Sequence, residues 1–128
     1  MLTIEPIGRI ITPCRTLEGC LRNICQDGHI RHLVVNEDLR DGLMVLHAGQ
    51  SILILYWFDR ADRTALQQNS RRTVELAGIF VLRTLNRRNP IGAAVVLIES
   101  TEDGTITVRG LGCLKGKPII DIKPDTVD

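Results

Sequence analysis

Short runs of β-branched and aliphatic residues recur along the chain, separated by segments rich in glycine, proline, asparagine and charged residues. This pattern predicts strands rather than helices, because strand-forming side chains dominate the runs and few of them repeat at helical spacing. The predicted strands span residues 3–11, 28–35, 51–58, 78–83, 93–99, 105–109 and 118–122.

Two of these runs differ in how their apolar residues are spaced. Residues 105–109 alternate, with Ile106 and Val108 on one face, which predicts a strand with a single buried face. Residues 52–58 are apolar throughout, which predicts a central strand covered on both sides. The Asp103-Gly104 step just before the alternating run favours a tight hairpin.

Signals for helices are few. Residues 36–43 offer a capping residue at Asn36 and an apolar pair at Leu39 and Leu43, which predicts one or two helical turns. The polar segment 60–75 predicts at most a second short helix. We therefore expect a mainly β, antiparallel domain with one or two short helices, and the pattern by itself leaves sandwich and barrel open.

Length and composition support a single folded domain over residues 1–128. The chain has a mass of 14.3 kDa, with 44% hydrophobic and 24% charged residues. It contains no stretch of about 18 apolar residues that could cross a membrane, and it begins with no signal peptide, so we expect no membrane association. Its four cysteines are predicted to be free thiols in a reducing compartment, with the cytoplasm as the expected location.

The charge balance excludes a broadly basic nucleic-acid binder. The net charge is +1 and only 3% of residues are aromatic, which also disfavours a stacking surface for single strands. Residues 71–128 nevertheless carry nine basic against seven acidic side chains, whereas residues 1–70 carry seven against eight. A local basic patch that faces phosphates and ordinary solvated charge both remain open.

The N-terminal third contains a cluster of possible metal ligands. Three cysteines and two histidines lie within nineteen residues: Cys14, Cys20, Cys25, His29 and His32. The cluster lacks the Cys-x2-Cys pair that places two zinc ligands on one turn, so no metal site is predicted.

Two glycine-containing segments attract attention. The glycines of residues 110–116 do not fit a dinucleotide-binding motif, since the third glycine comes one residue late and a strand-like run follows. They are better explained by close approach of the backbone to a neighbour or a ligand. Residues 83–92 form a long connection between two predicted strands, with three arginines and two asparagines that could grip a carboxylate, a phosphate or an adenine edge.

Residues 78–92, GIFVLRTLNRRNPIG, are similar to GVFATRSPxRPNPIG, and residues 111–124, LGCLKGKPIIDIKP, are similar to LDxLDGTPVLDIKP. Residues 52–59, ILILYWFD, are similar to IWVLFWFH, and residues 7–13 and 21–23 match an opening of the form IGxIxSP…PRQ. These four sequences are characteristic of the TsaA/TrmO (YaeB-like) family, which the chain resembles from about residue 7 to residue 124.

The resemblance implies a small, single-sheeted antiparallel β-barrel that binds S-adenosylmethionine (S-adenosyl-L-methionine) at a homodimer interface. It also implies methylation of the exocyclic amine of threonylcarbamoyl-adenosine beside the anticodon of tRNA. The cofactor-binding residues carried over from the family, or expected next to its motifs, are Arg22, Asn23, Asp59, Arg60, Arg83, Gly92, Ala93, Arg109, Gly110, Leu111, Gly112 and Cys113.

Other roles are assigned to residues outside that set. We expect Arg87, Arg88, Lys115 and Lys117 to contact tRNA, because they add positive charge to the same region. A proton acceptor would assist methyl transfer to an amine whose lone pair is delocalised, and Asn89 and Asp121 are the candidates for this polar, catalytic role.

The chain departs from the family pattern at several positions. Gly112 and Lys115 replace two aspartates of the terminal motif, and Lys117 replaces its threonine. These changes remove possible hydrogen-bond acceptors and make the cleft more positive. Two alternatives therefore stay open: a module that binds S-adenosylmethionine without catalysis, and a methyltransferase for a small adenine-like metabolite.

Overall fold

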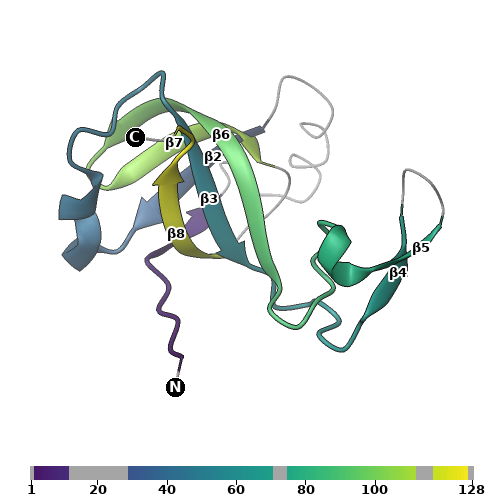
Figure 1. Cartoon of the computed structure of the whole chain (residues 1–128). Coiled ribbons are helices and arrows are strands. Elements are labelled where there is room, and N and C mark those ends of the chain that lie inside the picture. Colours follow the sequence, from purple (N-terminus) through teal and green to yellow (C-terminus); the bar gives the residue numbers. More distant parts are fainter. Residues whose placement is uncertain (1, 12–28, 71–74, 112–116, 127–128) are drawn as a thin grey trace, which may run out of the picture.

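A computed structural model describes residues 2–11, 29–70, 75–111 and 117–126. Its main body is a closed barrel of six strands in the order β1-β2-β7-β6-β3-β8, with every neighbouring pair antiparallel (Figure 1). The strands are β1 (Gly8–Ile11), β2 (His29–Val35), β3 (Ser51–Trp57), β6 (Ile91–Glu102), β7 (Thr105–Leu111) and β8 (Pro118–Pro124). The predicted mainly β barrel is confirmed.

The barrel interior is filled by alternate residues of each strand, because closure gives every strand one inner and one outer face. Ile106 and Val108 are both fully buried, as their alternation predicted. The core consists of Ile10, Leu33, Val35, Ile52, Ile54, Tyr56, Val96, Ile98, Ile106, Val108 and Ile119.

Strand β3 is not covered on both sides, so that prediction was wrong. Ile52, Ile54 and Tyr56 are buried in the barrel, whereas Leu53 and Leu55 on the outer face are only half-buried. An apolar run in a single-layer barrel has just one face to bury, whatever its composition.

The predicted hairpin joins β6 to β7. Asp103 and Gly104 both have positive φ, 47° and 79°, and Glu102 pairs with Thr105, so the loop has two residues. Such a loop matches the twist of antiparallel strands. The hairpin is confirmed, although β6 extends beyond the predicted 93–99 to Ile91 and Glu102.

The predicted helix at 36–43 is a 3-10 helix, η1 (Glu37–Leu43). The Asn36 side chain donates to the carbonyl oxygen of Pro6 at 3.3 Å and makes no capping bond to the helix. The predicted strand 3–11 begins only at Gly8, and the N-terminal end of the described chain extends away from the barrel (Figure 1). No helix in the part of the chain that the structure describes has the length and apolar character to span a membrane.

The described residues between β3 and β6, 58–70 and 75–90, form an arm that projects from one end of the barrel (Figure 1). The arm contains a two-stranded antiparallel sheet, β4 (Gln67–Asn69) and β5 (Leu76–Gly78), followed by a 3-10 turn, η2 (Ile79–Val81). Within the described part of 60–75 there is no helix, and 78–83 is not a strand. The strand prediction for 78–83 was wrong, since Gly78 is the last residue of β5 and residues 79–81 form η2. In the first segment, pairing with β5 makes residues 67–69 extended instead of helical.

Candidate functional site

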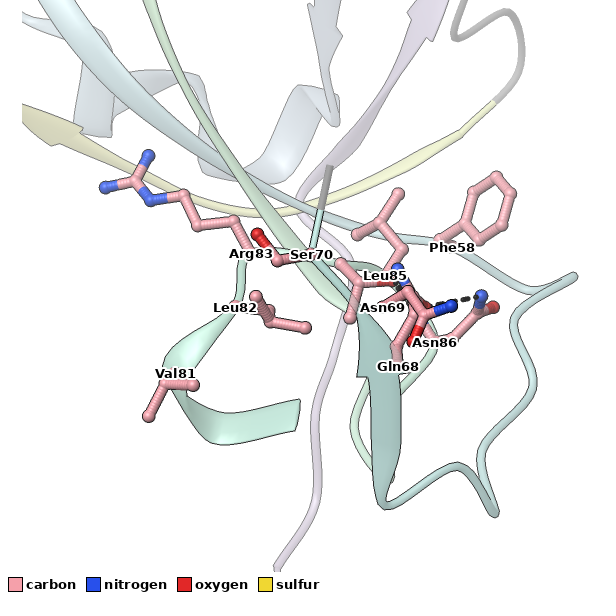
Figure 2. A pocket seen from close by; sticks show the side chains of 10 residues that line it. Phe58, Gln68, Asn69, Ser70, Val81, Leu82, Arg83, Leu85 and Asn86 are labelled. Atoms are coloured by element: carbon pink, nitrogen blue, oxygen red, sulfur yellow. Dashed lines mark hydrogen bonds between the residues drawn. The ribbon is translucent and has the colours of Figure 1, made fainter. Parts of the chain in front are cut away.

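A groove of about 780 Å³ lies on the arm. Its size falls within the usual range for small-molecule sites. In the view of Figure 2, Arg83 and Phe58 lie at opposite ends of the group of side chains that line it. The lining residues are Phe58, Gln68, Asn69, Ser70, Val81, Leu82, Arg83, Thr84, Leu85 and Asn86.

Hydrogen bonds fix the wall of the groove between β4 and the loop that follows η2. The hydroxyl of Thr84 donates to Oε1 of Gln68 at 3.0 Å, and Nδ2 of Asn86 donates to the same oxygen at 3.4 Å (Figure 2). The amide N–H of Asp62 donates to Oδ1 of Asn86 at 3.0 Å. Segments distant in sequence are therefore held together around the groove.

Arg83 supplies positive charge at the groove. Its side chain is exposed and lines the cavity, and no hydrogen bond or ion pair joins it to the residues that the structure describes. A guanidinium in this setting keeps its donors for a ligand and can bind oxygen or ring-nitrogen acceptors through charge-assisted bonds.

The two arginines that follow in the loop differ in their surroundings. Arg87 is half-buried, and its Nη1 donates to the carbonyl oxygens of Leu82 at 3.0 Å and Thr84 at 3.1 Å. Arg88 is exposed, and its own carbonyl accepts a bond from Nε of Arg63 at 2.7 Å. Arg87 therefore stabilises the loop, whereas the side chain of Arg88 faces solvent.

An ion pair stands beside the groove where β3 ends and β8 begins. Nζ of Lys117 donates to Oδ1 of Asp59 at 2.9 Å and lies 4.6 Å from the centroid of the Phe58 ring. The hydrogen bond from Lys117, reinforced by its charge, lowers the pKa of the Asp59 carboxyl below its ordinary value. Asp59 is therefore a carboxylate at neutral pH.

Two of the predicted cofactor residues lie in β6, directly after the groove-bearing loop. Gly92 is buried opposite Tyr56, and a Cβ at this position would overlap the tyrosine ring. Burial raises the pKa of the Tyr56 phenol, which therefore stays neutral. Ala93 is exposed on the outer face, and neither residue lines the groove.

The predicted residues of β7 lie on the far side of β6 from β3. Arg109 pairs with Glu99 at 2.5 Å, and Gly110 has a φ of 123°, a conformation that favours glycine. Leu111 ends the strand. Neither Arg109 nor Gly110 lines the groove.

The two residues predicted for catalysis do not line the groove. Asn89 is exposed, and its carbonyl accepts a bond from the amide of Ile91 at 2.7 Å. Asp121 pairs in register with Leu55 and forms a 3.2 Å ion pair with Lys123. Asp121 and Lys123 line a separate cavity next to η1.

Some predicted residues lie outside the described part of the chain. These are Arg22, Asn23, Gly112, Cys113 and Lys115, together with Cys14, Cys20 and Cys25 of the cluster considered for zinc. Of that cluster's histidines, His32 is described in full, and its Nδ1 lies 3.0 Å from the hydroxyl of Thr107. Arg60 is exposed next to Asp59.

Sequence reasoning missed the polar residues that line the groove. Gln68 and Asn69 fall in the segment predicted as helix, and only pairing with β5 reveals their position. Asn86 lies inside the oversized loop, which the sequence did single out as a binding region.

The fold and the groove define a small antiparallel β-barrel protein with a ligand-sized site on an inserted arm. Residues 12–127 match the family described as the tRNA-methyltransferase O N-terminal domain, and the chain belongs to that TrmO family. This confirms the resemblance inferred from the motifs.

Individual relatives are similar along most of this chain. An S-adenosyl-L-methionine-binding protein of Archaeoglobus fulgidus is 33% identical over 122 residues, covering 95% of this chain and 88% of that protein. A tRNA (adenine(37)-N6)-methyltransferase of Rattus norvegicus is 29% identical over 143 residues, covering 99% of this chain and 31% of that protein. A crystal structure of TrmO from Pseudomonas aeruginosa superposes with a TM-score of 0.73 at 25% identity, covering 98% of this chain. This chain spans 56% of that solved TrmO chain.

Proposed function

We propose that this chain binds S-adenosylmethionine on its arm and transfers the methyl group to the exocyclic amine of an adenosine in tRNA. The finer assignment is threonylcarbamoyl-adenosine beside the anticodon, in a cytoplasmic protein. The observation that carries the proposal is the 780 Å³ groove, whose lining includes the Arg83 matched to the family's cofactor arginine. The names of the archaeal and rat relatives support it.

The groove has the chemistry that a nucleoside cofactor requires. Apolar side chains of Leu82 and Leu85 and the Phe58 ring offer surfaces for a base and a sugar, and the amides of Gln68 and Asn69 offer hydrogen bonds. Arg83 can donate to ring nitrogens or ribose oxygens of the nucleoside end. These residues therefore fit S-adenosylmethionine.

The chain's contribution to methyl transfer is positioning. When bound, S-adenosylmethionine supplies an electrophilic methyl group on a sulfonium. The hydrogen-bonded wall around Gln68 and Asn86 fixes the groove, so that a bound ligand is held in one orientation for in-line attack. The exposed Arg88 at the end of the loop can contact a tRNA phosphate.

A second copy of the chain is part of the proposal. Four large apolar side chains are exposed on the arm: Leu66 (72%), Leu76 (63%), Phe80 (85%) and Val81 (77%). Exposed large apolar side chains on a projecting arm are what an interaction site would require. Val81 also lines the groove, so a partner seated on these side chains would complete the site.

The cofactor claim is tested by titrating the cofactor-free protein with S-adenosylmethionine, followed by calorimetry and by Trp57 fluorescence. We expect saturable binding near one site per chain, at least tenfold weaker in Arg83→Ala and unchanged in the matched variant Arg88→Ala. No binding at millimolar concentration, where the free energy falls to about −4 kcal/mol, contradicts the proposal. Binding without methyl transfer to tRNA supports the non-catalytic alternative, and transfer only to free adenine compounds supports the small-metabolite alternative.

The dimer is tested by sedimentation of a Phe80→Ser/Val81→Ser variant. We expect wild type to sediment as a dimer and the variant as a monomer. The control is Met44→Ser/Val45→Ser, two side chains that are similarly exposed (77% and 80%) in the loop after η1. A monomeric wild type, or equal effects of both variants, contradicts this part of the proposal.

A further inference from the structure

A second cavity, of about 620 Å³, lies at the end of the barrel opposite the arm. Strand β3 starts at this cavity with Ser51 and reaches the arm after Trp57, and Figure 1 shows η1 and the arm on opposite sides of the barrel. The proposed function uses none of the residues that line the cavity. Its walls are mainly apolar and include Ile7, Leu39, Leu43, Leu46, Ile52 and Ile122.

Exposed apolar side chains continue this surface beyond the cavity. Leu39 of η1 is exposed, and so are Met44 and Val45 in the loop that follows η1. Leu43 and Leu46 line both the 620 Å³ cavity and a neighbouring cavity of about 330 Å³, whose lining also includes Met44. The two cavities are therefore adjoining parts of one surface that is apolar along its middle.

Val45 in this surface has an unusual backbone conformation. Its φ is 75°, in the left-handed region that β-branched residues rarely adopt. This conformation costs free energy, and the side chain gains no burial in return, since it is exposed to solvent. Packing within the chain therefore does not explain an apolar side chain at this position, whereas contact with another molecule does.

The rim of the surface is acidic, although the whole chain has a net charge of +1. The acidic side chains that belong to η1 or line the two cavities are Glu37, Asp38, Asp41, Glu102, Asp103, Asp121 and Asp125. The same set contains two basic side chains, and both have partners. Nε of Arg40 donates to the carbonyl oxygen of Val35 at 3.3 Å, and Lys123 is paired with Asp121. The surface therefore carries a net negative charge around an apolar centre.

We propose that η1, the loop after it and the two cavities form a docking surface for a segment of a partner protein that carries apolar side chains flanked by lysine or arginine. The apolar side chains of this segment fill the 620 Å³ cavity and cover Met44 and Val45, and its cations face the acidic rim. The inference does not depend on the proposed function, because the groove on the arm lies at the other end of the barrel.

Two other occupants fit this surface less well. Phosphates are repelled by the acidic rim, which disfavours a nucleic acid. A second copy of the chain could offer basic residues from its arm, such as Arg63 and Arg88. A contact between the arm of one copy and the η1 end of the next does not close, so it would build filaments instead of a dimer.

The probe is a fluorescently labelled synthetic peptide of about 14 residues, with leucine at every third or fourth position and lysine at most of the others. It is titrated with the full chain and followed by anisotropy. Two matched peptides replace every lysine by glutamate or every leucine by serine. We expect the chain to bind the leucine–lysine peptide saturably, at least tenfold more tightly than either matched peptide. Added salt should weaken this binding without abolishing it, because the apolar contacts remain.

Variants of the chain locate the binding. Val45→Gly should weaken binding of the leucine–lysine peptide at least threefold without lowering the stability of the fold, since glycine adopts a φ of 75° without strain. Asp41→Asn/Asp125→Asn should weaken it at least fivefold. The matched control Asp62→Asn/Glu75→Gln removes two exposed negative charges from the arm and should leave peptide binding unchanged.

Every other result decides against the docking surface. Absence of saturable binding overturns the inference, as does equal affinity for the three peptides or an effect of the control as large as that of Asp41→Asn/Asp125→Asn. Filaments of the wild-type chain that disappear in Asp41→Asn/Asp125→Asn assign the surface to a second copy and also overturn it. In all of these cases binding of S-adenosylmethionine at the arm still upholds the proposed function.

Discussion

Arg87 and Arg88 are adjacent in the arm. Replacing each of them by alanine tests whether Arg87 stabilises the loop while Arg88 faces solvent. Arg87 donates two hydrogen bonds of 3.0 and 3.1 Å to the carbonyls of Leu82 and Thr84, and a weaker one of 3.5 Å to that of Ile79. Each bond from a charged donor contributes about 1 kcal/mol here, because the site is half-buried and water can replace part of what is lost. Arg87→Ala should therefore destabilise the loop locally by about 1–2 kcal/mol.

The assay is hydrogen exchange of amides in the loop. The amide of Leu82, which donates to the carbonyl of Ile79 at 3.0 Å, and the amide of Asn86, which donates to the Thr84 hydroxyl at 3.2 Å, report local opening. A loss of about 1–2 kcal/mol corresponds to roughly 5- to 30-fold faster exchange. Arg88→Ala should leave these amides unchanged, since its carbonyl still accepts the bond from Arg63.

Binding to tRNA should depend on Arg88, whose side chain faces solvent. Arg88→Ala is expected to weaken tRNA binding and to reduce the slope of its salt dependence by about one, because one phosphate contact is lost. Equal exchange rates in the two variants would refute the assignment of Arg87 to the loop. A tRNA affinity and salt slope in Arg88→Ala equal to those of wild type would remove this part of the loop from the tRNA surface.

Two further variants test the barrel and the ion pair. Gly92→Ala should lower the free energy of unfolding by about 1–3 kcal/mol, measured by denaturant titration, because its methyl group would overlap the Tyr56 ring. The control Gly78→Ala places its methyl group in open space and should change the free energy of unfolding little. Equal losses in the two variants would contradict the packing argument. Pairing with Lys117 lowers the pKa of Asp59 in the folded chain, so the pair stabilises the fold above the ordinary aspartate pKa of 3.8 and this contribution disappears as the pH falls through the lower folded value. The stability difference between wild type and Asp59→Asn should accordingly be constant from pH 8 to about pH 5 and should decline below pH 3.8, as the pH approaches the lower folded value. A difference that grows on acidification contradicts the pairing.

The barrel could be predicted where a local pattern alone determines the structure. Alternation at Ile106 and Val108 needs only one inner face, and the Asp103-Gly104 step needs only a positive φ at two positions. Coverage of β3 could not be predicted, because composition does not say whether a second layer exists outside the strand. The arm could not be predicted either, since β4 forms by pairing with β5 and not by its own propensity.

The sequence predicted the loop that borders the candidate site, and it did not predict the residues of β4 that line the groove. The density of arginine and asparagine in 83–92 identified a binding loop, and Arg83 and Asn86 do line the groove. The pattern could not separate Arg87 from Arg88, because the carbonyls that bind Arg87 become neighbours only when the chain turns at η2. Asp121 was placed near the site by its motif, whereas its strand position directs it to a different cavity.

The central claim is tested most directly by methyl transfer. Wild-type protein is incubated with S-adenosylmethionine labelled in its methyl group and with tRNA from cells that lack this chain, and the label is then traced by mass spectrometry of the nucleosides. The account predicts label on the exocyclic amine of an adenosine derivative next to the anticodon, with transfer reduced at least tenfold in Arg83→Ala. Saturable cofactor binding with no label in any nucleoside of the tRNA would contradict it.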